Sequence, residues 1–324
     1  MPENDKRMGG RDSRKSRQTT VIKVGDTYGL CNRLFPFAHL LAAAVEYGWS
    51  IRHAAFAEFS DFFEGTNTQP VPVYPPLGTF ARRAARMLTP VTTVGCRVFR
   101  KMKWHSCIAI EDHQTCDLSD HFIRQTVESC RVTQLAGLYF YDTLAFSKHA
   151  DLVRQYFCPI PFVHDLVSQS LSPARAGSDV VVGVHIRHGD YQTFCNGIMY
   201  YTFAEYARLM KTVAELFPGK RVSFLVCSNA ALPKGELHGL RVHPGPGHVV
   251  GDVYALARCD YIIGPPSTYS EWASFYGQVP RYIHRAKDYE WNGQPWPGLQ
   301  LQDFSVHSEG FARCNPKHPA TLIA

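Results

Sequence analysis

The stretch VVVGVHIRHGDYQTF, residues 180–194, joins a hydrophobic run to a cluster of polar side chains. The apolar run ends at His185, Arg187, His188 and Asp190. Neighbouring side chains of a strand alternate between its two faces, so His185 and Arg187 share one side and His188 points to the other. The two histidines are therefore poorly placed to bind one metal ion, and Arg187 between them would repel a cation.

Arg187 is suited to an anionic ligand. Ligands of open α/β sheets bind beyond the carboxyl ends of the strands, which is where this run loses its apolar character. A guanidinium there can donate two hydrogen bonds to phosphate oxygens. The structural alternative is an ion pair between Arg187 and Asp190 that holds the loop. Both interpretations hold together if Asp190 orients the guanidinium.

A second cluster lies in DYIIGPPSTYSEWASFYG, residues 260–277. Ser267 and Thr268 precede a predicted helix whose first turn carries Ser270. Ordinary N-capping by a Ser or Thr would explain these residues. The same geometry can also bind an anion through free backbone N–H groups at the helix start. Because predicted strands flank this helix, we expect its start at the same sheet edge as Arg187.

A third cluster is GDTYGLCNR, residues 25–33. Gly25 and Gly29 allow the backbone to approach a ligand closely, and Asn32 opens a predicted helix. On its own this pattern is a weak indication of function.

The elements that must position these clusters follow an α/β order. A strand over 19–24, a glycine-bearing turn and a helix over 31–48 open the chain. Beyond residue 179 we predict strands over 180–186, 222–229, 260–264 and 280–284, and helices over 203–217, 251–259 and 267–277. Their Val/Ile runs are continuous rather than alternating, which favours a parallel sheet covered on both faces.

Length and composition indicate two globular domains. A chain of 324 residues favours two domains, and the small, polar stretch 171–179 suits a linker between them. We therefore expect a disordered basic tail over 1–20, an N-terminal Rossmann-like domain over 21–172 and a C-terminal one over 173–324.

Charge and cysteine usage argue against several functions. Half of the net charge of +6 comes from the first 20 residues, and no nucleic-acid recognition motif accompanies it, so we expect no nucleic-acid partner. The ten cysteines form no CxxC pair, which argues against structural zinc and for reduced thiols. Without a secretory signal or an apolar run of about 18 residues, the chain is expected to be soluble and cytoplasmic.

The segment 79–104 carries seven Lys or Arg residues interleaved with aromatic and aliphatic ones. A solvated helix face with core contacts would explain it. The alternative is a surface for an anionic acceptor at the inner membrane leaflet, with peripheral membrane contact.

Together these clusters resemble a known enzyme family. HIRHGDY resembles the HxRRxDY motif of α-1,2-fucosyltransferases and their α-1,6- and protein O-fucosyltransferase relatives. GLCNRLFPFA resembles the family's GLGNQMFQYA, and STYSEWASFYG resembles its STFSWWAAYL. GDVYALARCDYII resembles the family's aspartate-and-cysteine segment, which precedes STFSWWAAYL. Order and spacing agree over about residues 20–285.

The resemblance implies a GT-B fold, with two Rossmann-like domains facing across a cleft. It also implies GDP-fucose as the donor, no required metal or other cofactor, and inverting transfer to a glycan hydroxyl, with an α-1,2 linkage expected. Arg187 is expected to hold the diphosphate, His185 and Asp252 to lie near the guanosine, and Asn32 to lie near the transferred sugar. The remaining donor-binding residues expected are Gly29, Ser267, Thr268 and Ser270.

Three departures bear on the site. His188 replaces the family's second arginine and weakens one positive charge at neutral pH. Cys31 and Arg33 replace a glycine and a glutamine, which bears on acceptor contacts. Asp190 and Asp26 are the candidate catalytic bases. A GT-B enzyme for another GDP- or UDP-sugar, and a non-catalytic phosphate or nucleic-acid binding module, remain the alternative functions.

Overall fold

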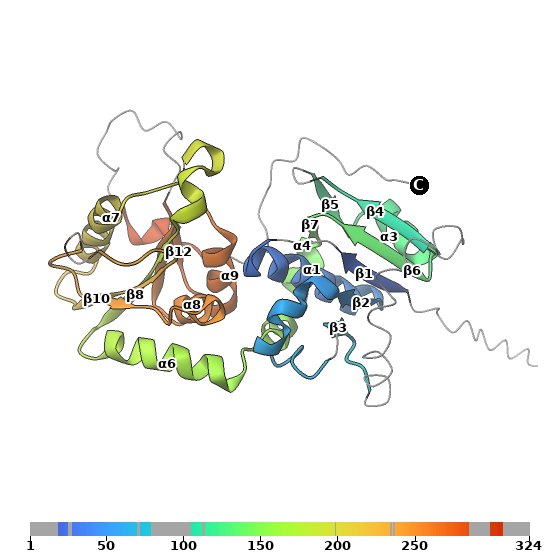
Figure 1. Cartoon of the computed structure of the whole chain (residues 1–324), viewed down its shortest axis with the longest axis horizontal. Coiled ribbons are helices and arrows are strands. Elements are labelled where there is room, and N and C mark those ends of the chain that lie inside the picture. Colours follow the sequence, from blue (N-terminus) through green and yellow to red (C-terminus); the bar gives the residue numbers. More distant parts are fainter. Residues whose placement is uncertain are drawn as a thin grey trace, which may run out of the picture.

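The computed structural model describes residues 19–24, 28–69, 72–78, 105–111, 114–197, 199–233, 235, 237–284 and 299–306. Most of the tail predicted over 1–20, together with Gly25, Asp26 and the basic segment 79–104, lies outside the described residues. Figure 1 shows the strands gathered in two separate α/β halves. We call residues 19–160 the N-terminal half and residues 161–306 the C-terminal half.

The N-terminal half is built on a sheet of order β3-β2-β1-β6-β4. Only β3 runs antiparallel to its neighbour. Its strands are β1 (Thr20–Val24), β2 (Ser50–His53), β3 (Val73–Tyr74), β4 (His105–Ala109) and β6 (Val132–Ala136). β5 (Thr115–Asp117) and β7 (Tyr139–Tyr141) pair separately. The helices are α1 (Leu30–Tyr47), α3 (His121–Ser129), α4 (Thr143–Lys148) and α5 (Ala150–Tyr156), with a 3-10 segment η1 (Ala54–Phe62).

The C-terminal half contains a fully parallel sheet of order β10-β9-β8-β11-β12. The strands are β8 (Val180–Ile186), β9 (Val222–Ser228), β10 (Val242–Pro244), β11 (Tyr261–Gly264) and β12 (Arg281–Ile283). The helices are α6 (Pro161–Arg175), α7 (Phe203–Glu215), α8 (Val249–Leu256) and α9 (Thr268–Gly277). Short 3-10 segments are η2 (Gly189–Gln192), η3 (Phe194–Gly197) and η4 (Leu301–Asp303). The predicted parallel sheet is confirmed, and residues 181–186 of β8 are all buried, as expected for a strand covered on both faces.

The stretch 171–179, which suits a linker by composition, is largely helical. Its first residues, Leu171 to Arg175, are the last turns of α6, which packs against α8, β9 and β10. Leu171 and Ala174 continue the buried stripe that Val163 and Val167 begin, and this helical spacing outweighs the small, polar composition. Arg175 also donates to both carboxylate oxygens of Asp260, at 2.8 and 2.6 Å.

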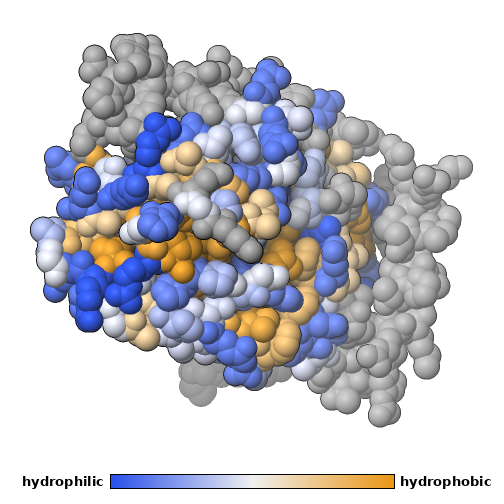
Figure 2. Space-filling view, turned by 60° about the vertical axis from the view of Figure 1, so that its left-hand side comes forward, coloured by the Kyte–Doolittle hydropathy of each residue, from blue (hydrophilic) through white to orange (hydrophobic). Residues whose placement is uncertain are grey.

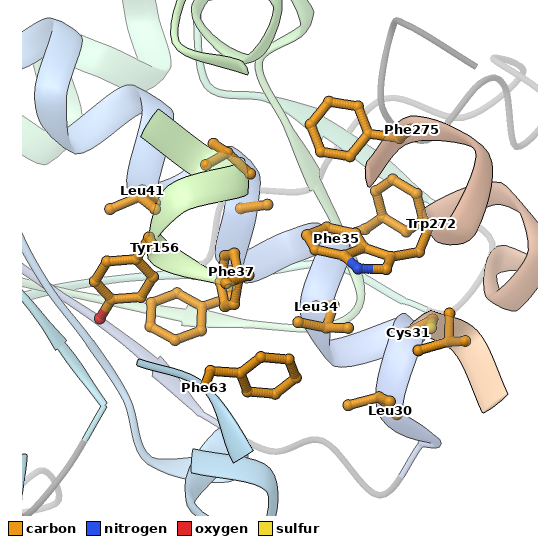
Figure 3. Packing of buried hydrophobic residues seen from close by; sticks show 14 of the residues in the cluster. Leu30, Cys31, Leu34, Phe35, Phe37, Leu41, Phe63, Tyr156, Trp272 and Phe275 are labelled. Carbon is orange, nitrogen blue, oxygen red and sulfur yellow. The ribbon is translucent and has the colours of Figure 1, made fainter. Parts of the chain in front are cut away.

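The two halves share one hydrophobic core where α1 meets α9 (Figure 3). The ring of Phe35 in α1 lies edge-on to Trp272 in α9, with centroids 5.3 Å apart, and both side chains are fully buried. Phe157 also lies edge-on to Trp272, with ring centroids 5.4 Å apart. This packing holds the N-terminal ends of α1 and α9 next to each other.

In the view of Figure 2, hydrophobic residues gather in patches across the middle of the described surface, with hydrophilic residues above and below them. None of the helices in the described part of the chain is long and apolar enough to cross a bilayer.

Candidate functional site

A cavity of about 360 Å³ lies where both halves meet, at the carboxyl ends of β8 and β9 and the starts of α1, α8 and α9. This is the position at which open parallel sheets bind ligands. The lining residues are Gly29, Leu30, Cys31, Asn32, His185, Ile186, Arg187, Cys227, Ser228, Asn229, Gly247, Val249, Asp252, Thr268 and Tyr269.

Six of the nine residues predicted from the sequence line this cavity. Five of them come from the three sequence clusters, and Asp252 comes from the segment GDVYALARCDYII. The six are Gly29, Asn32, His185, Arg187, Asp252 and Thr268. Asp190, Ser267 and Ser270 lie close in the fold but are not among the lining residues.

Arg187 follows β8 and is held by Asp190. Its Nε donates to Asp190 Oδ1 at 3.1 Å, and its Nη2 donates to Oδ2 at 2.6 Å. Burial alone would lower the pKa of Arg187, but the hydrogen bonds to Asp190 leave it raised, so the guanidinium is always charged. The side chain of Arg187 remains 35% exposed. The same hydrogen bonds lower the pKa of Asp190. Both Asp190 oxygens are thus engaged, which favours an orienting role over that of a base.

His185 lies beside Arg187 and is neutral. Burial, together with the nearby positive charges of Arg187 and Arg281, lowers its pKa to about 3. The ring packs on that of Tyr269, with centroids 5.0 Å apart. Nδ1 of His185 is buried and has no hydrogen-bond partner among the described residues. The site therefore contains an uncharged ring nitrogen next to a permanent cation.

His188 points away from the cavity, as the alternation of side chains predicts. Its Nε2 lies 2.8 Å from the carbonyl oxygen of Tyr201, and its ring packs on Tyr200 and Phe203. Its backbone N–H donates to Oδ1 of Asn229 at 2.8 Å. This buried ring anchors the loop after β8.

The start of α9 is capped by its own side chains. Ser267 Oγ accepts from the backbone N–H of Tyr269 at 3.2 Å, and Ser270 Oγ donates to the carbonyl of Ser267 at 3.3 Å. Arg281 Nη1 donates to the Ser267 carbonyl and to Ser270 Oγ, at 3.2 and 3.1 Å. The capping interpretation of Ser267 is confirmed. The hydroxyls of Ser267 and Ser270 stabilise the helix start rather than facing the cavity.

The start of α1 differs, because no side chain of the described residues caps it. Gly29 is the N-cap, with extended backbone angles (φ −64°, ψ 172°), and the three residues after it all line the cavity. The first N–H groups of a helix lack partners within the helix, and the helix dipole adds a partial positive charge there. This 18-residue helix therefore presents an electropositive end to the cavity.

Arg33, in the first turn of α1, is directed away from the cavity. Its Nε donates to the carbonyl of Tyr28 at 2.6 Å, and its Nη1 donates to Ala55 O and Glu58 Oε2, both at 2.8 Å. Its guanidinium also lies 5.2 Å from the ring centroid of Phe59. Arg33 thus ties the turn before α1 to η1. Arg33 is not among the cavity-lining residues.

Asn32 and Thr268 connect the two halves at the cavity. Thr268 Oγ1 donates to Asn32 Oδ1 at 2.7 Å, although 236 positions separate the two residues in the sequence. This bond sets the side chain of Asn32, next to the start of α1, against the start of α9.

Asp252, in the first turn of α8, is the carboxylate that lines the cavity within the described residues. Its Oδ1 accepts from the backbone N–H of Gly247 at 2.7 Å. Burial raises its pKa to about 6, despite the hydrogen bonds from Gly247 and His248. Its charge therefore changes close to neutral pH.

Several lining residues were not predicted, among them Cys227, Ser228, Asn229, Gly247, Val249 and Tyr269. Two signals could have found them. The predicted strand 222–229 ends in Ser228 and Asn229, the same pattern of an apolar run ending in polar residues as at Arg187. The sequence GPGH, residues 245–248, is a glycine-bearing turn before a helix, like the turn before α1.

The described residues contain no group of three or more His, Cys, Asp or Glu side chains that could together hold a metal ion.

No protein-family model matches the chain, and no curated protein matches its sequence. Solved structures do match its fold. An Arg-to-Lys mutant of Arabidopsis thaliana FUT1 in complex with GDP is 17% identical with a TM-score of 0.56, covering 85% of this chain and 73% of that one. POFUT1 in complex with GDP-fucose is 12% identical with a TM-score of 0.51, covering 84% of this chain and 99% of that one.

POFUT1 in its apo form gives a TM-score of 0.50 at 13% identity, over 82% of this chain and 98% of that one. At such low identities a likeness shows the fold alone. The fold of this chain is the mixed α/β, GT-B fold of fucosyltransferases.

Proposed function

We propose that this protein is an inverting glycosyltransferase that transfers fucose from GDP-fucose to a glycan hydroxyl, with an α-1,2 linkage. One observation carries the proposal: a permanently charged guanidinium and an electropositive helix end line the same cavity, at the sheet edge where this fold binds ligands. The GDP and GDP-fucose in the structures with the same fold support this choice of donor.

Arg187 and the start of α1 would hold the diphosphate, with the start of α9 beside them. A guanidinium offers two parallel donors to phosphate oxygens, and helix N–H groups offer more. These groups neutralise the negative charge of the diphosphate, which a divalent cation would otherwise do. The proposed reaction therefore requires no metal.

Asp252 and His185 would receive the guanosine. An ionised carboxylate can accept two hydrogen bonds from the N1–H and 2-amino groups along one edge of guanine. Burial of Asp252 makes such hydrogen bonds stronger than they would be in water. The neutral ring of His185, packed on Tyr269, adds an uncharged polar contact.

In the proposed reaction the acceptor hydroxyl attacks the anomeric carbon of fucose from the face opposite the phosphate. The bond between that carbon and the phosphate oxygen breaks, and its electron pair leaves with GDP. Negative charge therefore grows on the diphosphate, where Arg187 and the start of α1 stabilise it most. Asn32 would face the transferred sugar, held in place by Thr268.

The acceptor proton passes to a carboxylate base or to solvent. Asp190 is less suited to this task, because Arg187 engages both of its oxygens and lowers its pKa. Asp26, in the turn before α1, is the remaining candidate base and lies outside the described residues.

We also propose a cytoplasmic location and peripheral contact with anionic membranes through the basic segment 79–104. Each basic residue near an anionic surface can add about 1 kcal/mol of binding. Co-sedimentation with anionic but not zwitterionic vesicles, reversed by salt, is the expected result. Replacing Arg82, Arg83 and Arg86 with Gln should weaken vesicle binding and leave GDP affinity unchanged. Failure of the wild type to bind anionic vesicles at low salt would remove the membrane contact from the proposal.

The decisive experiment is a donor screen. GDP-fucose, GDP-mannose and UDP-sugars are incubated with the protein and a panel of glycan acceptors, and the released nucleotide is measured with and without EDTA. Acceptor-dependent release of GDP from GDP-fucose, unaffected by EDTA, is expected. Release from a different donor alone would make the protein another kind of glycosyltransferase, and strict dependence on Mn²⁺ or Mg²⁺ would contradict the metal-free reaction.

A further inference from the structure

Tyr191 lies directly behind the guanidinium of Arg187 without lining the cavity itself. The Cζ atom of Arg187 is 4.6 Å from the centroid of the Tyr191 ring, a distance typical of a cation–π contact. Tyr191 is buried, and its hydroxyl donates to the carbonyl oxygen of Pro266 at 2.9 Å. One side chain therefore contacts both the cation of the site and the segment that leads into α9.

The contacts of Tyr191 and Asp190 with Arg187 are complementary. Asp190 accepts from the edge of the guanidinium, through Nε and Nη2. The side chain of Asp190 is 54% exposed, so solvent screens its ion pair with Arg187. This ion pair also fixes the guanidinium along one edge only. The guanidinium of Arg187 lies over the face of the Tyr191 ring, and this contact adds a second restraint to the bonds that Asp190 accepts. Phe194 stacks on Tyr191 at 5.7 Å with an interplanar angle of 17°, which supports the ring.

The hydroxyl of Tyr191 connects the Arg187 contacts to the starts of α9 and α1. Pro266 precedes Ser267, the N-cap of α9, and Thr268 of α9 donates to Asn32 at the start of α1. The chain of contacts runs from Arg187 through Tyr191 and Pro266 to both helix starts. A phenylalanine could supply the ring contact but not the bond to Pro266.

We propose that Tyr191 is a positioning residue, which holds the guanidinium of Arg187 in a fixed orientation relative to the starts of α9 and α1. This inference rests on the proposed function for the identity of the bound group, the diphosphate of GDP. The positioning of Arg187 itself can be measured without any ligand.

The first test compares GDP with guanosine by isothermal titration calorimetry. Tyr191→Leu removes ring and hydroxyl, and should weaken GDP binding about tenfold, as expected for loss of a partly desolvated cation–π contact. Guanosine affinity should stay within about twofold, because guanosine lacks the diphosphate that Arg187 would hold. Tyr191→Phe, which keeps the ring, should lose only about threefold, the cost of one ordinary hydrogen bond.

Tyr254→Phe is the matched control. Tyr254 is also buried, and its hydroxyl also donates to a backbone carbonyl, that of Phe157 at 2.6 Å, but it belongs to the core between the halves. Loss of this hydroxyl should lower thermal stability without separating GDP from guanosine affinity. An equal loss of GDP and guanosine affinity in Tyr191→Leu, or a GDP-selective loss in Tyr254→Phe, would overturn the assignment.

The second test uses the unliganded protein. The Nε–H signal of Arg187 in a ¹⁵N-arginine NMR spectrum is assigned through its disappearance in Arg187→Lys. Slow exchange of this proton with water is expected in the wild type and in Tyr191→Phe, and faster exchange in Tyr191→Leu. Unchanged exchange in Tyr191→Leu would contradict the inference. If Tyr191→Leu does not fold, the GDP-selective loss in Tyr191→Phe decides it. If the wild type binds no GDP, the proposed function fails, whereas the exchange rates still decide the positioning role.

Discussion

Arg187 forms the ion pair with Asp190 that its sequence position suggests, and it also lines the cavity. Asp190 and Tyr191 orient it from within the protein, and its remaining exposed part is presented to the cavity. A lysine ammonium is a compact charge and cannot form both in-plane hydrogen bonds to Asp190 while also offering a planar donor pair to phosphate. The identity of this residue, not only its charge, should therefore control the reaction.

Arg187→Lys should reduce kcat/KM for GDP-fucose by about 100-fold or more, in the range seen when a key charge stabiliser is removed. The effect is checked by initial rates of GDP release, with circular dichroism to confirm folding. Arg175→Lys is the control, because Arg175 also forms a two-bond pair with a carboxylate, that of Asp260, at the amino ends of β8 and β11 and away from the cavity-lining residues. Near-normal turnover by a folded Arg187→Lys protein would contradict the role of Arg187.

Asp252 should make nucleoside binding dependent on pH. Its pKa is raised to about 6, so lowering the pH through that value protonates the carboxylate and removes its acceptor capacity for guanine N1–H and the 2-amino group. His185, with a pKa of about 3, stays neutral over the same range. Guanosine affinity should thus fall as the pH drops below about 6.

Guanosine is the probe for this experiment because it has no phosphate that titrates in the same range. Asp252→Asn should bind guanosine weakly at every pH, with a flat profile between pH 5 and 8. A wild-type profile that is equally flat would remove Asp252 from the nucleoside site.

At the residue scale, sequence patterns found Arg187 after β8, missed Ser228 and Asn229 at the end of the predicted strand 222–229, and did not show which distant residues meet in the fold. The position of Arg187 at the end of an apolar run was sufficient to predict that it lies at the ligand-binding edge of the sheet, where it lines the cavity. Ser267 and Ser270 were expected to face the ligand, but local hydrogen bonds and Arg281 engage them. No local sequence pattern predicts the hydrogen bond from Thr268 to Asn32, because that bond depends on how the two halves pack.

At the scale of elements, no side chain of the described residues caps the start of α1. Its first backbone N–H groups are therefore available to the proposed ligand. Gly29 has ordinary extended angles, and a Cβ placed there meets no atom within 4 Å, so a side chain would fit without strain. Asp at an N-cap typically stabilises a helix by about 1 kcal/mol relative to a residue that cannot cap. Here the same carboxylate would occupy the region that the proposed diphosphate needs.

Gly29→Asp should therefore stabilise the fold slightly and weaken GDP binding at least about tenfold, through repulsion and blocked N–H groups. Differential scanning fluorimetry and calorimetric titration measure the two effects. Gly29→Asn is the control, since it adds a cap of similar size without the charge and should lose less GDP affinity than Gly29→Asp. Equal GDP affinity in wild type and Gly29→Asp would mean that the start of α1 does not hold the anion.

In the C-terminal half the sequence predicted β8, β9, β11 and β12 with α7, α8 and α9, because continuous Val/Ile runs specify buried parallel strands, but it did not predict β10 or α6. The small, polar composition of 171–179 did not predict that residues 171–175 are helical, because two buried positions at helical spacing continue α6 there. In the N-terminal half, β4 to β7 are short and mostly half-buried, so their runs are too brief to predict from hydrophobicity.

At the scale of the whole molecule, two sheets are joined by one core. Trp272 of α9 is fully buried against Phe35 and Phe157 of the N-terminal half, and its Nε1 donates to the hydroxyl of Tyr254 at 3.4 Å. The cavity lies beside this contact and takes residues from both halves. The relative placement of α1 and α9 therefore depends on apolar packing rather than on a covalent cross-link between the helices. The cavity in turn depends on this placement.

We expect the two halves to unfold together in the wild type. Hydrogen exchange measured at increasing urea concentration should show β1 and β8 losing protection at the same midpoint. Trp272→Ala, with a typical cost of about 3–5 kcal/mol for a buried aromatic, should separate these midpoints because it removes the contact between the halves. Met210→Ala is the control, since Met210 is fully buried in the separate core cluster of the C-terminal half. Met210→Ala should lower the stability while β1 and β8 still lose protection together. Separate midpoints in the wild type would show instead that each half is stable alone, and that the cavity between them is held by the Thr268–Asn32 bond and weak packing.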